Sequence, residues 1–199
     1  KERSREYITY CPSELIYRYT KDGNRKNWVV FNRFLLETIL DRYPEKKLVL
    51  LAHVLRPEHA DDRIMVGELY DLLSTRYKEQ ILAERGEMYP YEVRNYIQQS
   101  VFVVSGRMHP VISSIQCGIP AIALSYSSKY WGIIGERYGL GEYIIDVRYL
   151  NYKEMKGRFI YLINKIEDEY EQIEEKIKKN NTMAKKNILS ALEEIRDLK

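Results

Sequence analysis

Short apolar runs alternate along most of the chain with stretches in which apolar residues recur at helical spacing. Six runs rich in aliphatic, aromatic or β-branched residues predict strands, at 6–11, 47–53, 80–83, 101–104, 120–125 and 143–146. Five stretches between them predict helices, at 25–43, from 61–62 to beyond 73, 90–100, 110–117 and 128–138. Chain breakers support this division, since Pro44 follows the first helix and Gly118 ends the fourth.

This alternation predicts an α/β fold with a six-stranded, parallel, Rossmann-like sheet and helices on both faces. The continuous apolar run at 47–53 is typical of a strand that is buried on both sides. With the strand order 3-2-1-4-5-6, the loops after the first and fourth strands face each other at the carboxyl edge of the sheet, where ligands bind in such folds. The candidate site therefore includes Cys11–Glu14 and Ser105–His109.

After Val147 the pattern becomes helical only. Apolar residues repeat every three or four positions from Phe159 to Ile177, which predicts a long helix with a heptad-like stripe. We expect Asn180–Thr182 to break this helix and a last helix to follow. The chain thus divides into a Rossmann-like domain at 1–150 and C-terminal helices at 151–199 that pack on it. The alternative is that these helices dock onto another domain or join two copies in a homo-oligomer.

Composition narrows the class of protein further. The 199 residues are 45% hydrophobic and 12% aromatic, which excludes low-complexity disorder and fits one α/β domain with appendages. A net charge of +3, from 32 basic and 29 acidic residues, is too balanced to indicate a nucleic-acid partner. Two cysteines build no disulfide scaffold and no apolar signal region is present, so we predict a cytoplasmic location. Because the chain begins at Lys1, we expect it to be a piece of a larger protein.

The loop after the fourth strand contains the most informative candidate chemistry. Gly106 lets the backbone approach a ligand closely, and the helix headed by Pro110 directs the positive end of its dipole toward an anion. Arg107 offers a planar guanidinium suited to carboxylate or phosphate, and His109 can donate to an anion or transfer a proton. This loop favours an anionic substrate that needs acid–base catalysis. The alternative is a surface loop in which Arg107 pairs with a nearby aspartate and His109 caps a helix.

A wider pattern surrounds this loop. Ser105-Gly106-Arg107-Met108-His109 is followed by Gly118-Ile119-Pro120, an apolar strand, and Tyr126 and Lys129. This pattern resembles the polysaccharide pyruvyl transferase family, which has Ser-x-Arg-x-His, then Gly-x-Pro, an apolar strand, and a Tyr followed by a Lys. A looser similarity extends from Tyr7 to Asp146. Members of the family resemble type B glycosyltransferases (GT-B), in which two Rossmann-like domains enclose a cleft, and this chain matches only the C-terminal domain.

The resemblance implies that the chain is the donor-binding half of an enzyme of exopolysaccharide biosynthesis, with its N-terminal partner domain absent. The implied reaction transfers a pyruvyl group from phosphoenolpyruvate, the donor substrate, to a sugar or glycan acceptor as a ketal, with no further cofactor. His109 and Arg107 are the implied catalytic residues. The implied substrate-binding residues are Ser13, Ser105, Gly106, Arg107, His109, Tyr126 and Lys129. Since one wall of the cleft is absent, we expect the isolated chain to be incomplete as an enzyme.

Two other functions are compatible with the predicted architecture. One is the donor domain of a nucleotide-sugar-dependent GT-B glycosyltransferase, although Glu136, the only acidic candidate for the ribose hydroxyls, lies too far into its predicted helix. The other is a non-catalytic assembly domain that uses the C-terminal helices as an interface. No metal site is predicted, because the spacing of His53, His59, Asp61 and Asp62 fits no common set of ligands.

Overall fold

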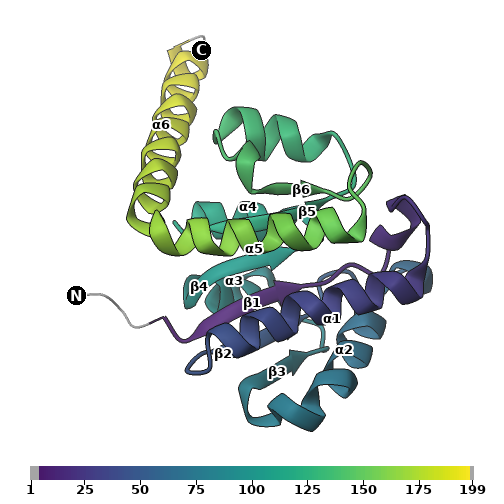
Figure 1. The fold of residues 1–199 in the computed structure, drawn as a ribbon. Coiled ribbons are helices and arrows are strands. Elements are labelled where there is room, and N and C mark those ends of the chain that lie inside the picture. Colours follow the sequence, from purple (N-terminus) through teal and green to yellow (C-terminus); the bar gives the residue numbers. More distant parts are fainter. Residues whose placement is uncertain (1–4, 198–199) are drawn as a thin grey trace.

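The core of the protein is an open, twisted, parallel sheet between two layers of helices (Figure 1). A computed structural model describes residues 5–197. Its strands are β1 (Tyr7–Cys11), β2 (Lys47–Leu51), β3 (Ile81–Glu84), β4 (Ser100–Ser105), β5 (Ala121–Ser125) and β6 (Ile144–Asp146). They lie in the order β3-β2-β1-β4-β5-β6, and every neighbouring pair is parallel. The fold class predicted from the sequence is confirmed, and the strand order is the one considered there.

The helices divide between the two faces as right-handed crossovers require. One face is covered by α1 (Arg25–Arg42), α2 (Asp62–Tyr77) and α5 (Tyr152–Asp168), and the other by α3 (Pro90–Gln98) and α4 (Met108–Gln116) (Figure 1). The chain moves outward from β1 to β3 and then returns to β4, so the crossovers change face at α3. This reversal places the loops after β1 and β4 next to each other at the carboxyl edge.

Several element boundaries differ from the sequence prediction. β2 ends at Leu51 rather than at His53, so His53 lies in the loop beyond the sheet. α4 begins at Met108, two residues before Pro110, because the N–H groups of the first helical turn have no partner within the helix and proline there removes no bond. The helix expected at 128–138 is a π-helix, η4 (Trp131–Arg137).

The C-terminal helices break at a different residue from the one predicted. The interruption is at Glu169, between α5 and α6 (Tyr170–Asp197), and α6 continues through Asn180–Thr182. The side chains of Asn180 and Asn181 do not compete with the helix backbone, because they donate outward to the carbonyl oxygens of Tyr138 and Ile115, at 2.7 and 2.8 Å. The prediction of a break at 180–182 was therefore wrong.

The two halves of α6 have different surroundings. The first half passes the amino edge of the sheet, where Tyr170 donates a hydrogen bond to the carbonyl oxygen of Val101 and Ile177 is fully buried. The second half extends away from the sheet (Figure 1). The apolar stripe continues along this second half and is exposed to solvent, since Ile188 and Leu192 are 62% and 57% exposed.

Candidate functional site

The loops after β1 and β4 pack directly against each other. The N–H of Gly106 donates to the carbonyl oxygen of Cys11 at 2.9 Å. A Cβ on Gly106 would lie 2.7 Å from Cδ1 of Ile16 and 2.9 Å from Cβ of Ser13, closer than carbon atoms approach. Gly106 is therefore required for the contact between the loops, whereas the sequence suggested that it admits a ligand.

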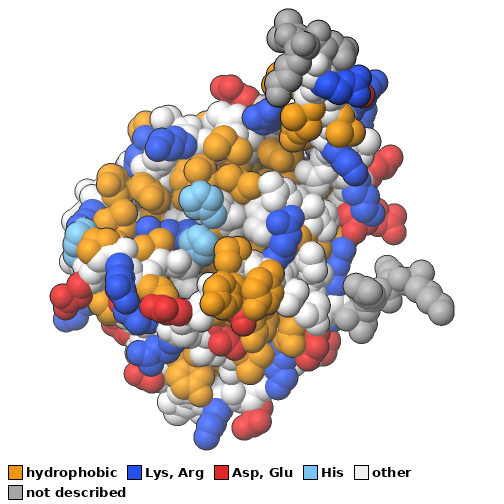
Figure 2. Space-filling view, turned by 180° about the vertical axis from the view of Figure 1, so that it is seen from behind, with side chains coloured by type: hydrophobic (Ala, Val, Ile, Leu, Met, Phe, Trp, Pro, Cys, Tyr) orange, Lys and Arg blue, Asp and Glu red, His pale blue; other side chains and the backbone are white. Residues whose placement is uncertain are grey.

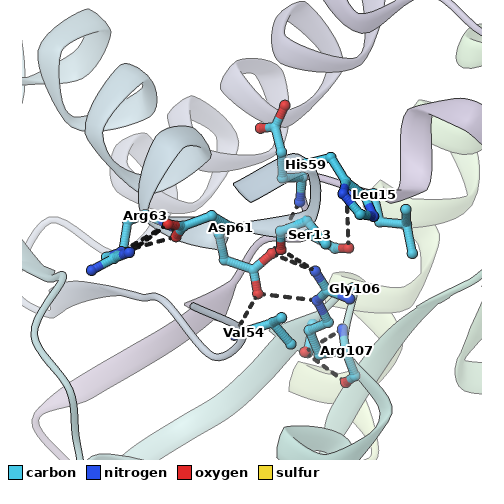
Figure 3. A network of polar contacts seen from close by, with 12 residues as sticks. Ser13, Leu15, Val54, His59, Asp61, Arg63, Gly106 and Arg107 are labelled. Carbon is cyan, nitrogen blue, oxygen red and sulfur yellow. Dashed lines mark hydrogen bonds and ion pairs between the residues drawn. The ribbon is translucent and has the colours of Figure 1, made fainter. Parts of the chain in front are cut away.

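Arg107 lies at the carboxyl edge in a buried ion pair with Asp62, the first residue of α2. Its Nε and Nη2 donate to Oδ2 and Oδ1 of Asp62 at 3.0 and 2.7 Å, and Nη2 also donates to the carbonyl oxygen of Ala60 at 2.9 Å (Figure 3). The N–H groups of Glu14 and Val54 donate to the same carboxylate at 3.1 and 2.9 Å. One aspartate thus joins the loops after β1, β2 and β4.

This ion pair leaves part of the Arg107 guanidinium unused. Arginine has five N–H donors, and here Nε and Nη2 supply three of them. Nη1 makes no hydrogen bond with any described residue, and within residues 5–197 no side-chain nitrogen or oxygen is buried without a partner. Nη1 therefore keeps some contact with solvent, and its two donors have no partner among the described residues. The pairing with an aspartate and a role in anion binding are both compatible with this geometry.

The two serines of the predicted site are buried and face inward. Oγ of Ser105 donates to the carbonyl oxygen of Arg107 at 2.8 Å and accepts from the N–H of Arg107 at 2.9 Å. Oγ of Ser13 accepts from the N–H of Leu15 at 3.3 Å, and neither serine is exposed to solvent. Both serines hold the loops in shape and present no hydroxyl to a ligand.

His109 lies at a pocket of about 340 Å³ at the carboxyl edge. His53 also lines this pocket, and its ring centroid is 6.0 Å from that of His109. The other lining residues are mostly apolar: Ala52, Leu55, Gly86, Met88, Pro90, Val93, Pro110 and Ser113. Figure 2 shows histidine side chains bordered by hydrophobic ones on this face.

The surroundings of His53 favour its neutral form. Burial lowers the pKa of His53, the negative charge of Asp62 opposes this, and positive charge on His109 and Arg107 lowers the pKa further. A neutral imidazole can accept a proton, so this residue suits a general base. The sequence pointed to His109 but did not associate His53 with it.

Tyr126 and Lys129 do not line this pocket. Tyr126 packs between Tyr19 and Tyr130, with ring centroids 5.0 and 6.0 Å away. Lys129 is exposed and, among the described residues, has no hydrogen-bond or ion-pair partner. The buried Tyr130 instead reaches the loop after β4, where its hydroxyl donates to the carbonyl oxygen of Gly106 at 3.1 Å. Of the candidate residues, only His109 lines the pocket, together with His53. Arg107 lies close enough for its charge to lower the pKa of His53 but does not line the pocket, and Tyr126 and Lys129 also lie outside it.

The acidic and histidine residues considered as metal ligands have other roles. Asp61 is the N-cap of α2, where it accepts from the N–H of Arg63 at 2.9 Å, and Asp62 binds Arg107. Within residues 5–197, no three His, Cys, Asp or Glu side chains gather in a way that could hold a metal ion.

Comparison with known proteins identifies the family of the chain. The model of the family described as polysaccharide pyruvyl transferase matches residues 7–128, which include Ser13, the whole loop 105–109 and Tyr126 and stop one residue before Lys129. The chain belongs to this family. Among curated proteins, it is similar to the amylovoran biosynthesis protein AmsJ of Erwinia amylovora, with 29% identity over 119 residues. That match covers 60% of this chain and 27% of AmsJ.

Solved structures of low sequence identity share the fold. The UDP-GlcNAc 2-epimerase of Neisseria meningitidis has a TM-score of 0.53 at 13% identity, with 96% of this chain and 45% of that chain covered. The N-terminal domain of trehalose-6-phosphate phosphatase from Candida albicans has a TM-score of 0.59 at 12% identity, with 91% and 39% covered. The chain thus spans less than half of the length of AmsJ and of each of these two solved structures. In the part that the structure describes, no helix has the length and apolar character to cross a bilayer.

Proposed function

We propose that this chain is the donor-binding part of a polysaccharide pyruvyl transferase that uses phosphoenolpyruvate as its donor and a sugar hydroxyl pair as its acceptor. The observation that supports this most is the pre-oriented guanidinium of Arg107, which has two free donors on Nη1, in a loop that also carries His109 at a pocket. The family match covers this whole loop.

Phosphoenolpyruvate has two anionic groups and needs directional donors. Asp62 holds Arg107 by two hydrogen bonds, so binding of an anion at Nη1 costs little side-chain entropy. A phosphate or a carboxylate accepts both donors of Nη1 more readily than a neutral group does. His109, two residues further along the chain, is exposed and free to contact the same substrate.

The proposed reaction begins with the transfer of a proton to the donor substrate. His109 donates a proton to the methylene carbon C3 of phosphoenolpyruvate, and positive charge develops at C2. One sugar hydroxyl then bonds to C2 and loses its proton, the C2–O bond to phosphate breaks, and the second hydroxyl adds to C2 and loses its own proton. The products are inorganic phosphate and a cyclic ketal. Of the two hydroxyl protons, one ends on the phosphate and the other restores the proton that His109 gave up. His53, neutral and 6.0 Å from His109 between ring centroids, is placed to accept one of the hydroxyl protons.

The proposal includes a second wall for the cleft. Catalysis between two substrates depends on holding both in attack geometry, and an N-terminal Rossmann-like domain would contribute the acceptor contacts that this chain does not supply. We expect the isolated chain to fold and to bind the donor, and to release little phosphate when given donor and acceptor together. The free cysteines Cys11 and Cys117 fit a cytoplasmic location.

The test is calorimetric titration of the 199-residue chain with phosphoenolpyruvate. Replacing Arg107 by Lys should weaken binding about 10- to 100-fold, since a lysine cannot donate both to Asp62 and, in a fixed fork, to an anion. Arg76→Lys, a change at an exposed arginine of α2 outside the site, is the matched control and should leave affinity unchanged. Equal affinity of the Arg107→Lys variant and the wild type would refute the proposed donor site. Tighter binding of a nucleotide sugar than of phosphoenolpyruvate would favour a glycosyltransferase instead.

A further inference from the structure

Two exposed tyrosines stand at the rim of the histidine pocket. Tyr89 is the N-cap of α3 and Tyr91 lies in its first turn, on either side of Pro90, which lines the pocket. Their side chains are 68% and 63% exposed. Their rings stack in parallel, with centroids 5.7 Å apart and planes 8° apart.

These rings contribute little to the hydrophobic core. Neither belongs to the buried clusters, and neither hydroxyl makes a hydrogen bond with a described residue. The backbone between them is held in place, because the N–H of Tyr89 donates to the Glu92 carboxylate at 2.7 Å. The result is an exposed aromatic platform with two free hydroxyls beside a pocket.

A pyranose ring has the chemistry that matches this platform. One face of a sugar presents C–H groups that pack on aromatic rings, and its edge presents hydroxyls that need donors and acceptors. The pocket supplies apolar contacts from Met88 and Val93 and imidazole nitrogens from His53 and His109. Its volume of about 340 Å³ is in the range of small-molecule sites.

We propose that Tyr89 and Tyr91, with the adjoining pocket, form a subsite for a sugar ring of the acceptor, whose hydroxyls point toward His53 and His109. This inference rests on the proposed function, because it places acceptor hydroxyls next to the histidine that protonates the donor. It adds that this chain contributes acceptor contacts of its own, in addition to those expected from the second wall.

The experiment is saturation-transfer difference NMR of the 199-residue chain with methyl glucopyranoside, methyl galactopyranoside and methyl mannopyranoside as probes. Tyr89→Ala and Tyr91→Ala should each weaken the binding of at least one probe about three- to tenfold, the scale of a stacked ring contact. The corresponding Phe variants keep the ring and should retain most of the affinity. Tyr149→Ala is the matched control: this tyrosine is 66% exposed and follows β6, at the opposite edge of the sheet from β3.

Each result of the NMR experiment either supports the proposed sugar subsite or overturns it. Loss of binding in the Ala variants, with the Phe variants and Tyr149→Ala unchanged, supports the subsite. Equal binding by wild type and both Ala variants, or no saturable binding of any probe by the wild type, overturns it. Calorimetry with phosphoenolpyruvate on the same samples separates the two claims. If the donor binds and no sugar does, only the subsite fails, and if sugars bind through the tyrosines and the donor does not bind, only the donor assignment fails.

Discussion

Replacing Asp62 by Asn should destabilise the fold by about 3–5 kcal/mol, because it removes one partner of a buried ion pair and leaves the other charge uncompensated. Asp62 is fully buried and accepts four hydrogen bonds. Each carboxylate oxygen accepts one bond from the backbone and one from Arg107.

The same magnitude follows from counting the bonds. An asparagine has one carbonyl oxygen, which can keep two of the four donors. Its amide nitrogen then faces the other two, one of them on the charged guanidinium. Leaving a buried donor unsatisfied costs about 1–3 kcal/mol, and more when it is charged, so two such donors give a similar total.

The assay is equilibrium unfolding in urea. The free energy of unfolding of each variant is compared with that of the wild type at a common m value, the slope of this free energy against urea concentration. Asp71→Asn is the matched control, since Asp71 is exposed on the same helix, and it should change stability by less than about 0.5 kcal/mol. A double variant, Asp62→Asn with Arg107→Gln, should lose less stability than the sum of the two single changes, because neither charge is then left alone. An Asp62→Asn variant within about 0.5 kcal/mol of wild type would refute the reasoning.

The remaining predictions concern three other features. Gly106→Ala should destabilise the fold by about 1–3 kcal/mol in the same assay, since the new Cβ would lie 2.7 Å from Ile16. His53 should titrate below the ordinary histidine value in proton NMR, so wild-type stability should fall as the pH drops from about 6.5 through the lowered pKa, a loss that His53→Gln removes. The exposed stripe of α6 should cause concentration-dependent self-association, and Ile188→Lys with Leu192→Lys should abolish it in sedimentation velocity.

Matched controls are available for the first and the last of these. Gly132→Ala, where no atom lies within 4 Å of the new Cβ, should not destabilise. Val30→Lys, an exposed change on α1, should leave self-association unchanged. Unperturbed stability of Gly106→Ala, a His53 midpoint at or above 6.5, or a strictly monomeric wild type at high concentration would each contradict the corresponding prediction.

The sheet and its order could be predicted because they depend on local patterns and on one rule of handedness. Apolar runs such as 47–51 and 101–104 identify buried strands, and right-handed crossovers with a reversal after the third strand lead to the observed order. The continuation of α6 through 180–182 could not be predicted, because Asn180 and Asn181 are poor helix formers and the sequence does not show that their side chains bind carbonyl groups of distant elements.

The sequence pointed to the loop after β4 as the candidate site but did not reveal which residues its side chains contact. Position at the carboxyl edge pointed to Arg107 and His109, but their partners come from the loop after β2 and the start of α2. Spacing along the chain does not reveal that Asp62 faces Arg107 or that His53 faces His109. The acidic pair at 61–62, next to a strand that ends at the same edge, is the one signal that could have suggested the ion pair.

The most direct test of the donor assignment is a crystal structure of this chain soaked with phosphoenolpyruvate. We expect density for the ligand with an anionic group within hydrogen-bond distance of Nη1 of Arg107 and with its methylene carbon toward the ring of His109. We also expect the Asp62–Arg107 pair to keep its two hydrogen bonds. Ligand density elsewhere on the protein, or an empty loop at a concentration that saturates binding in solution, would contradict the assignment of this loop as the donor site.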